Sequence, residues 1–258
     1  MPVNILAVGD VAGKCGLDIL SRRLRSIQRL ENIRFTVVNG ENAAGIGITP
    51  QQAREILSAG ADVITLGNHT WGRAEIADAL DDSPYILRPA NFAPQAPGRG
   101  YGVFETSFGE VAVINLIGRC SMDFGPDNPF LEADRILRKI SARIVLVDFH
   151  AEATSEKIAL ANYLDGRVSA VWGTHTHVQT SDGCVLPKGT GYITDLGMTG
   201  PINSVIGVKT EISVSFFLGN PPRRFEAADG EGKLECAVFV IDEKSGKCLE
   251  VKALRITD

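Results

Sequence analysis

Histidine is scarce in this sequence, and each copy lies where a predicted strand ends. The 258 residues contain four histidines, each close to a carboxylate or amide side chain. Ligands of open α/β sheets bind in the crevice beyond the carboxyl ends of the strands. We therefore expect the polar clusters that end five predicted strands to converge in space. They are Gly9-Asp10, Asn39-Gly40-Glu41-Asn42, Gly67-Asn68-His69, Asp148-Phe149-His150 and Gly173-Thr174-His175-Thr176-His177.

The residue types in these clusters favour a centre that holds two metal ions. Asp, Glu, Asn and His supply a mixture of oxygen and nitrogen ligands that suits Zn, Mn or Fe. They are too numerous for one tetrahedral ion, whereas two ions that share a carboxylate would use all of them. Two ions about 3.5–4 Å apart are a recurrent solution for the hydrolysis of phosphate esters. His175 and His177 form the strongest pair, because residues two apart in a strand extension face the same side.

Each of these residues also has an ordinary structural interpretation. Asp10 and Glu41 could be polar loop residues, Asn68 could cap a helix, and His150 could be a satisfied histidine near the core. All four histidines at strand ends, each beside a carboxylate or amide, are nevertheless difficult to obtain by chance. The joint pattern favours the metal centre over the separate explanations.

The segments that would position the clusters alternate between strands and helices. Thr49 is predicted to cap a helix, with Pro50 at its first position and Gln52 completing a capping box, and Gly60 is placed to end it. Short β-branched runs predict strands at 5–8, 35–38, 62–66, 144–147 and 168–172, and helical periodicity predicts helices at 17–30, 50–60, 73–80, 128–140 and 155–164. Residues 103–117 predict a hairpin, and the last third predicts strands near 190–194, 211–218, 235–241 and 248–256.

This order of elements indicates the α/β class. The first two thirds alternate strands with helices, and the last third is typical of antiparallel β structure. Two packed sheets flanked by helices would accommodate both parts. No internal repeat, low-complexity tract or linker divides the sequence, so we expect a single domain over residues 1–258.

Composition argues against several classes of protein. The chain carries 26 Lys and Arg against 31 Asp and Glu, a net charge of −5, so duplex nucleic acid is not an expected partner. No apolar run reaches the 18 residues typical of a membrane span, and no charged leader indicates a signal peptide. Five cysteines without a Cys-x-x-Cys pair favour a reducing, cytoplasmic setting.

At the five clusters the sequence resembles the calcineurin-like metallophosphoesterases. The Gly-Asn-His and Gly-x-His-x-His pieces are specific in combination, and their order and spacing agree with that superfamily. Longer strings make the sequence similar to the bacterial YmdB subfamily of cyclic-nucleotide phosphodiesterases. The resemblance extends from the first strand to about residue 210, and the strings are residues 39–44, 67–71, 88–92, 148–157 and 173–180.

The resemblance implies a four-layer α/β/β/α sandwich with mixed sheets and a centre of two metal ions. Iron is the expected metal, with manganese or zinc as alternatives. His69, which lies beside a ligand, would act as the proton donor. The ligands implied are Asp10 and His177 with Asn42 for the first ion, Asn68, His150 and His175 for the second ion, and Glu41 as the bridge.

The sequence departs from the wider superfamily at two positions. The usual Asp-x-His motif is Asp10-Val11-Ala12 here, and Glu41 stands where the bridging residue is usually Asp. The loss of one imidazole leaves the first ion in a more oxygen-rich environment, with Asn42 as a candidate substitute. The identity of that metal is therefore left open.

The expected reaction is the hydrolysis of a phosphodiester. Two cations neutralise the phosphate and lower the pKa of a bridging water, so that hydroxide exists near neutral pH and attacks phosphorus. The leaving alkoxide needs a proton, which His69 can supply. The resemblance implies small cyclic nucleotides as substrates, foremost 2′,3′-cyclic nucleotide monophosphates. Loops 44–48 and 179–181 are candidates for shaping the substrate pocket.

Two other functions stay open at this stage. One is a phosphomonoesterase of the same superfamily, such as a nucleotidase. The other is a metal-dependent regulatory or scaffold protein whose centre is structural, although the additional His69 favours a catalytic site. A homo-oligomer also stays open. The sequence lacks a P-loop, a dinucleotide fingerprint and a Gly-x-Ser-x-Gly elbow.

Overall fold

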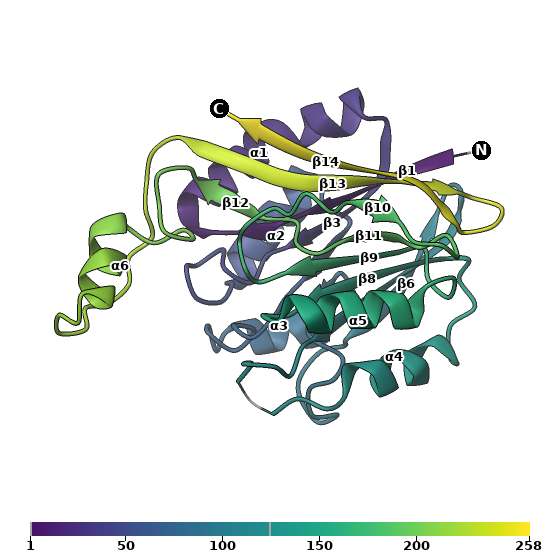
Figure 1. Cartoon of the computed structure of the whole chain (residues 1–258), viewed down its shortest axis with the longest axis horizontal. Helices are drawn as coiled ribbons and strands as arrows, with labels where there is room; N and C mark the ends of the chain where they lie inside the picture. The colour runs from purple at the N-terminus through teal and green to yellow at the C-terminus, as the bar shows by residue number, and fades with distance from the viewer. Residues whose placement is uncertain (1, 124) are drawn as a thin grey trace.

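Two β-sheets lie face to face between two layers of helices (Figure 1). The computed structural model describes residues 2–123 and 125–258. The first sheet has the order β2-β12-β13-β1-β3-β4-β5, with β14 paired to β13, and the second has the order β10-β11-β9-β8-β7-β6. Parallel and antiparallel pairs occur in both sheets. The α/β class and the four-layer α/β/β/α sandwich with mixed sheets are confirmed.

The bounds of the elements follow the chain. The first sheet contains β1 (Pro2–Val8), β2 (Asp10–Val11), β3 (Ile33–Asn39), β4 (Val63–Thr65), β5 (Ile86–Leu87), β12 (Met198–Pro201), β13 (Gly232–Asp242) and β14 (Cys248–Thr257). The second sheet contains β6 (Tyr101–Thr106), β7 (Gly109–Ile117), β8 (Ile144–His150), β9 (Ala170–Thr174), β10 (Cys184–Val185) and β11 (Gly191–Ile193). The helices are α1 (Gly13–Leu30), α2 (Pro50–Ala59), α3 (Ile76–Asp82), α4 (Pro129–Leu137), α5 (Thr154–Leu164) and α6 (Thr210–Phe217).

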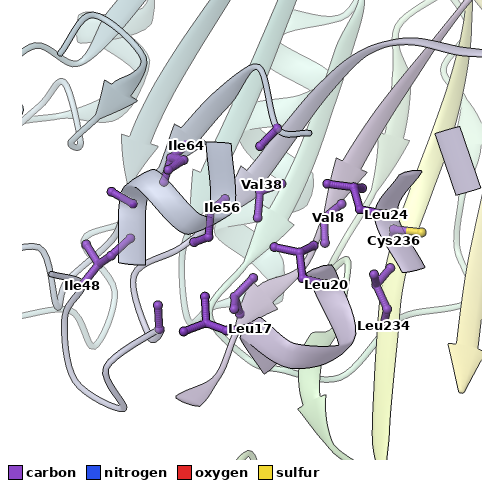
Figure 2. Packing of buried hydrophobic residues seen from close by; sticks show 14 of the residues in the cluster. Val8, Leu17, Leu20, Leu24, Val38, Ile48, Ile56, Ile64, Leu234 and Cys236 are labelled. Atoms are coloured by element: carbon purple, nitrogen blue, oxygen red, sulfur yellow. The ribbon is translucent and has the colours of Figure 1, made fainter. Parts of the chain in front are cut away.

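Three apolar cores separate the four layers. The first packs α1, α2 and α3 against the outer face of the first sheet, and Figure 2 shows Leu20 and Leu24 of α1 beside Val8 of β1. The second core joins the two sheets, where Trp172 of β9 meets Phe239 of β13 with ring centroids 5.5 Å apart. The third packs α4 and α5 on the second sheet. Burial on both faces is typical of parallel strands covered by helices.

The parallel strands carry the polar clusters to shared edges. β1, β3 and β4 run parallel in the first sheet, and β7, β8 and β9 run parallel in the second. Their carboxyl ends are therefore at one edge of each sheet. This arrangement positions the residues that follow each strand.

Most sequence-predicted elements are confirmed, including details of their ends. Thr49 caps α2 with a complete capping box, and Gly60 ends that helix with a φ of 126°. Asn128 caps α4 by accepting hydrogen bonds from the backbone of Phe130 and Leu131. The hairpin of β6 and β7 turns just before Gly109. The single-domain organisation over residues 1–258 stays a prediction.

The strand predicted at 211–218 is wrong, because this segment forms helix α6. Alternating Ile212, Val214 and Phe216 gave it the period of a strand, but the segment leaves the sheets between β12 and β13. Figure 1 shows α6 standing apart from the layers, at the left of the view. Without a strand beside it, the backbone satisfies its polar groups by helical hydrogen bonds. Gly219, with a φ of 80°, follows the helix end.

None of the helices in the described part of the chain combines the length and the apolar character that a membrane span requires.

Replacing Thr49 by Ala tests the link between α2 and the loop that carries Glu41. Thr49 Oγ1 accepts from the Gln52 N–H at 3.2 Å, and the Gln52 side chain also donates to the Ala43 carbonyl at 3.0 Å. We expect Thr49→Ala to lower the free energy of unfolding by about 1 kcal/mol, measured by urea denaturation. Thr49→Ser, which keeps the hydroxyl, should stay near the parent value; equal losses in both variants would contradict the capping role.

Candidate metal centre

Every residue of the predicted site lies near the carboxyl end of a parallel strand, in β2, in β8 or in a segment that follows β3, β4 or β9. Asp10 begins the short β2 just after β1, and His150 is the last residue of β8. The side chains of all eight predicted residues join one continuous network of polar contacts. They are Asp10, Glu41, Asn42, Asn68, His69, His150, His175 and His177. The predicted convergence of the five clusters is confirmed.

His150 Nε2 is the meeting point of the first group of ligand atoms. It lies 2.9 Å from Asn68 Oδ1, 3.1 Å from Glu41 Oε1 and 3.1 Å from His175 Nδ1. Both oxygens are acceptors, and one ring nitrogen carries at most one hydrogen, so a single proton on Nε2 cannot bond fully to both of them. The ligand atoms of Glu41, His150 and His175 all lie within 4.8 Å of one another. This donor set fits a metal ion.

A second group of atoms surrounds Asp10, which is fully buried. Its Oδ2 accepts from the His175 N–H at 3.2 Å, but among the described residues its Oδ1 has no hydrogen-bond partner. His177 Nε2 lies 3.7 Å from that oxygen and 3.1 Å from Asn42 Nδ2. An unpaired buried carboxylate oxygen is costly, and a cation beside it would remove that cost. The second group therefore also fits a metal ion.

Glu41 lies between the two groups. Its Oε1 is 3.1 Å from His150 Nε2 and accepts from Asn42 Nδ2 at 3.1 Å, while its Oε2 accepts from the His69 N–H at 3.0 Å. The carboxylate thus contacts a ligand candidate of each group. That placement suits a carboxylate shared by two ions.

The backbone after β9 is not the strand extension that the sequence predicted. β9 ends at Thr174, and His175 and His177 adopt φ angles of 95° and 62°. Such angles are uncommon for residues other than glycine, and they gather at functional sites where the surroundings enforce them. The two imidazoles reach the site through this turn, so the alternation argument was wrong although the pair does converge.

A buried ion pair enforces this turn. Lys157 of α5 donates to Asp195 Oδ2 at 2.7 Å, and both side chains are almost fully buried. The same carboxylate accepts from the Thr176 hydroxyl at 2.7 Å and from the Thr176 N–H at 3.3 Å. Thr176 separates the two histidines, so these bonds fix the residue between them.

The outer ring nitrogens of two histidines are also held. His150 Nδ1 lies 2.9 Å from Thr174 Oγ1, whose hydroxyl donates to Asp148 Oδ1 at 2.8 Å. His177 Nδ1 donates to the Ile206 carbonyl at 2.9 Å. Each contact places the hydrogen on Nδ1 and directs the Nε2 lone pair into the site, as partners of metal-binding histidines do.

Burial and mutual attraction shift the pKa values of the buried groups in the site. Burial raises the pKa of Asp10 to about 6, against the opposing effect of the nearby imidazoles. Burial also acts to raise the pKa of Glu41, but the imidazole of His150 outweighs it and lowers this pKa to about 2. For His150, burial lowers the pKa, but Glu41 outweighs burial and raises it to about 9. The cluster therefore favours positive charge at this point, which a metal ion also supplies.

His175 responds in the opposite direction. Burial and the adjacent charge of His150 lower the pKa of its imidazole to about 3. A neutral imidazole keeps a lone pair for a metal ion. Its ring lies edge-on to that of His150, with centroids 4.8 Å apart.

His69 lies at the rim of the network. Its side chain is 36% exposed, in contrast to the fully buried Glu41 and His150. The ring Nδ1 lies 2.8 Å from Asn42 Oδ1 and 3.6 Å from Glu41 Oε1. The imidazole is therefore oriented by ligand candidates and still accessible from outside.

Several supporting residues were not identified from the sequence. Lys157 and Asp195 pair across 38 positions, and no local pattern predicts that contact. Asp148 was named in the fourth polar cluster without a role; it lies two residues before His150 on the same strand and shares its face. Gln179 is placed differently from the pocket role considered for loop 179–181, because its side-chain nitrogen lies 3.1 Å from the backbone carbonyls of Leu196, Cys236 and Leu254.

Gly67 allows the two sides of the site to approach, and its replacement tests the geometry. A Cβ atom at this position would lie 2.3 Å from His150 Cδ2 and 2.4 Å from Glu41 Oε2. We expect Gly67→Ala to displace these side chains and to reduce metal binding at least tenfold, on the order of the effect of disturbing the residues that orient ligands. Metal titration by calorimetry would measure the change. Gly183→Ala, whose nearest contact would be an ordinary 3.4 Å, is the control; unchanged metal binding in Gly67→Ala would contradict the geometry.

Comparison with known proteins supports a single family across nearly the whole chain. The model of the family described as YmdB-like protein matches residues 6–254. A relative in Bacillus subtilis (strain 168), named 2′,3′-cyclic-nucleotide 2′-phosphodiesterase, is 45% identical over 261 residues, covering 99% of this chain and 98% of the relative.

Solved structures agree with the family model. A hypothetical protein from Thermus thermophilus superposes with a TM-score of 0.93 at 40% identity, over 99% of this chain and 100% of that one. A structure described as a novel phosphatase from Mycoplasma pneumoniae superposes with a TM-score of 0.94 at 33% identity, over 100% and 94% of the two chains. The chain thus belongs to the YmdB-like family.

Proposed function

We propose that this protein is a metal-dependent phosphodiesterase that hydrolyses small cyclic nucleotides, with 2′,3′-cyclic nucleotide monophosphates as the preferred class. The observation that carries the proposal is the convergence of four strand ends of the two sheets and β2 on one buried cluster. In it Asp10 Oδ1 has no hydrogen-bond partner among the described residues, and His150 Nε2 faces two acceptor oxygens at once. The name of the Bacillus subtilis relative supports the substrate class.

Two ions share the cluster in this proposal. Asp10, Asn42 and His177 would hold the first ion, Asn68, His150 and His175 would hold the second, and Glu41 would contact both. The position of Glu41 between the two groups supports its role as the bridge. Iron is the proposed metal because the resemblance to the metallophosphoesterases implies it. Manganese and zinc are alternatives, since a mixed set of carboxylate, amide and imidazole ligands suits all three.

When bound, the two ions supply charge neutralisation for the phosphate and activation of a water molecule. The chain supplies orientation and proton transfer. The buried ligands fix the position of the phosphate, and His69 provides the proton that the departing ribose oxygen requires. The contact of His69 Nδ1 with Asn42 Oδ1 at 2.8 Å orients the ring. Because Nδ1 donates to that oxygen, the proton for the leaving group is the second one, which the protonated imidazole carries on Nε2. The exposed edge of His69 is compatible with a substrate that arrives from solvent.

The substrate class also fits the charge of the chain. A net charge of −5 offers no general attraction for duplex nucleic acid, whereas a local pair of cations attracts a single small phosphodiester. Phosphomonoester hydrolysis is the second candidate, because the related Mycoplasma pneumoniae structure is described as a phosphatase. The cytoplasmic location and a homo-oligomeric state stay predictions.

The decisive experiment couples metal analysis of the purified protein to a screen of phosphate esters. We expect about two ions per chain and hydrolysis of 2′,3′-cyclic nucleotides well above that of 3′,5′-cyclic nucleotides and of a monoester. Faster hydrolysis of the monoester would favour the phosphatase function. Retained metal without hydrolysis of any ester would favour a structural centre.

His69→Ala separates proton donation from metal binding. We expect both ions to be retained and kcat for a 2′,3′-cyclic nucleotide to fall by about 10²–10⁴-fold, the usual contribution of a general acid. Metal content by mass spectrometry and steady-state kinetics measure the two effects. His175→Ala is the contrasting variant, because it should lose the second ion; loss of metal in His69→Ala would instead make His69 a ligand.

A further inference from the structure

Glu152 lies at the outer edge of the site, two residues beyond His150 and just before α5 begins at Thr154. Its Oε2 is 3.1 Å from His175 Nε2, and its side chain is 51% exposed against 22% for that of His175. His175 is thus held on both sides of its ring. Nδ1 faces His150 Nε2 at 3.1 Å, and Nε2 faces the Glu152 carboxylate.

The carboxylate determines which nitrogen of His175 carries the hydrogen. A neutral imidazole has one N–H, and an ionised carboxylate can only accept a hydrogen bond. The contact at 3.1 Å therefore stabilises the tautomer with the hydrogen on Nε2. The lone pair of Nδ1 is then directed toward His150 and Glu41, whose ligand atoms lie within 4.8 Å of it.

The other two imidazoles proposed as ligands have their outer contact at the opposite ring nitrogen. His150 and His177 have their outer contacts at Nδ1, to Thr174 Oγ1 and to the Ile206 carbonyl, so their Nε2 atoms face the site. His175 presents Nδ1 instead, since Nδ1 is the atom that lies 3.1 Å from His150 Nε2. A partner at Nε2 is therefore required at this position, and the group at that place is Glu152.

We infer that Glu152 is a positioning residue for the second metal ion. Glu152 accepts the Nε2 hydrogen of His175, so that His175 presents Nδ1 as the ligand atom. The inference rests on the proposed function, since it adds a support to the proposed ligand His175. A carboxylate behind a ligating imidazole fixes the ring orientation and raises the basicity of the ligand. The half-exposed Glu152 does not touch the reacting atoms in this role.

Metal titration of Glu152→Ala, Glu152→Gln and Glu110→Ala tests the inference. Glu110 is the matched control, because it lies near the start of β7, while the far end of that strand pairs with His150. We expect Glu152→Ala to bind the second ion about 10–100-fold more weakly and the first ion unchanged. Glu152→Gln should fall between Glu152→Ala and the parent, because its amide oxygen can accept the hydrogen bond without the charge. Glu110→Ala should match the parent.

Nitrogen NMR of the zinc-loaded, ¹⁵N-histidine-labelled protein gives a second readout that folding alone would not move. The chain has four histidines, so His175 is assigned from the signal that His175→Ala lacks. We expect a slowly exchanging hydrogen on His175 Nε2 in the parent and fast exchange with solvent in Glu152→Ala. Circular dichroism checks that the variants keep the parent fold.

The possible results separate this inference from the proposed function. A parent protein that binds two ions while Glu152→Ala binds both equally tightly would overturn the role of Glu152 and leave the metal centre intact. A hydrogen on Nδ1 of His175 in the parent would overturn it as well. A parent that binds fewer than two ions would contradict the proposed centre itself.

Discussion

The structure depends on one electrostatic constraint, the burial of two carboxylates and several imidazole lone pairs at a common point. Asp10 and Glu41 are both fully buried, and each lies within 4 Å of an imidazole nitrogen that faces it. The transfer of such charges out of water is unfavourable unless positive charge accompanies them. The opposite pKa shifts of Glu41 and His150 express that demand. A pair of cations satisfies it more completely than a proton, because each cation accepts several lone pairs at once.

The two-sheet architecture is what makes such a concentration of ligands possible. A single sheet aligns the ends of its own parallel strands, but here β1, β3 and β4 contribute from one sheet while β8 and β9 contribute from the other. The apolar core between the sheets, with Trp172 against Phe239, holds these two edges together. The cost of gathering like charges is therefore offset by hydrophobic burial elsewhere in the fold.

Sequence patterns predicted what local chemistry controls and missed what distant contacts control. The cap at Thr49 depends on residues three positions away, and the strand ends were visible because polar residues interrupt apolar runs. The strand prediction for residues 211–218 was wrong because the alternation of apolar residues there is also compatible with a strand. Within the described fold this segment has no neighbouring strand, and it forms a helix.

The conformation of His175 and His177 lies beyond local patterns for the same reason. Their positive φ angles flank Thr176, which bonds to the Asp195 carboxylate that Lys157 also contacts. Asp195 and Lys157 are distant in sequence from each other. The candidate ligands could thus be named from their types, while the turn that presents two of them could not.

Asn42 connects the candidate metal ligands to the proposed proton donor. In the orientation described, its Oδ1 faces His69 Nδ1, and its Nδ2 faces Glu41 and His177. The oxygen and nitrogen of an amide exchange places when the group rotates by half a turn, and the hydrogen-bond network decides between the two orientations.

An Asn42 oxygen turned toward a cation beside His177 would turn the amide nitrogen toward His69. That nitrogen donates a hydrogen, so His69 Nδ1 would accept it, and a neutral His69 would then carry its own hydrogen on Nε2. If Asn42 Oδ1 bound the first ion, His69 would therefore carry on Nε2 the proton that the leaving group needs.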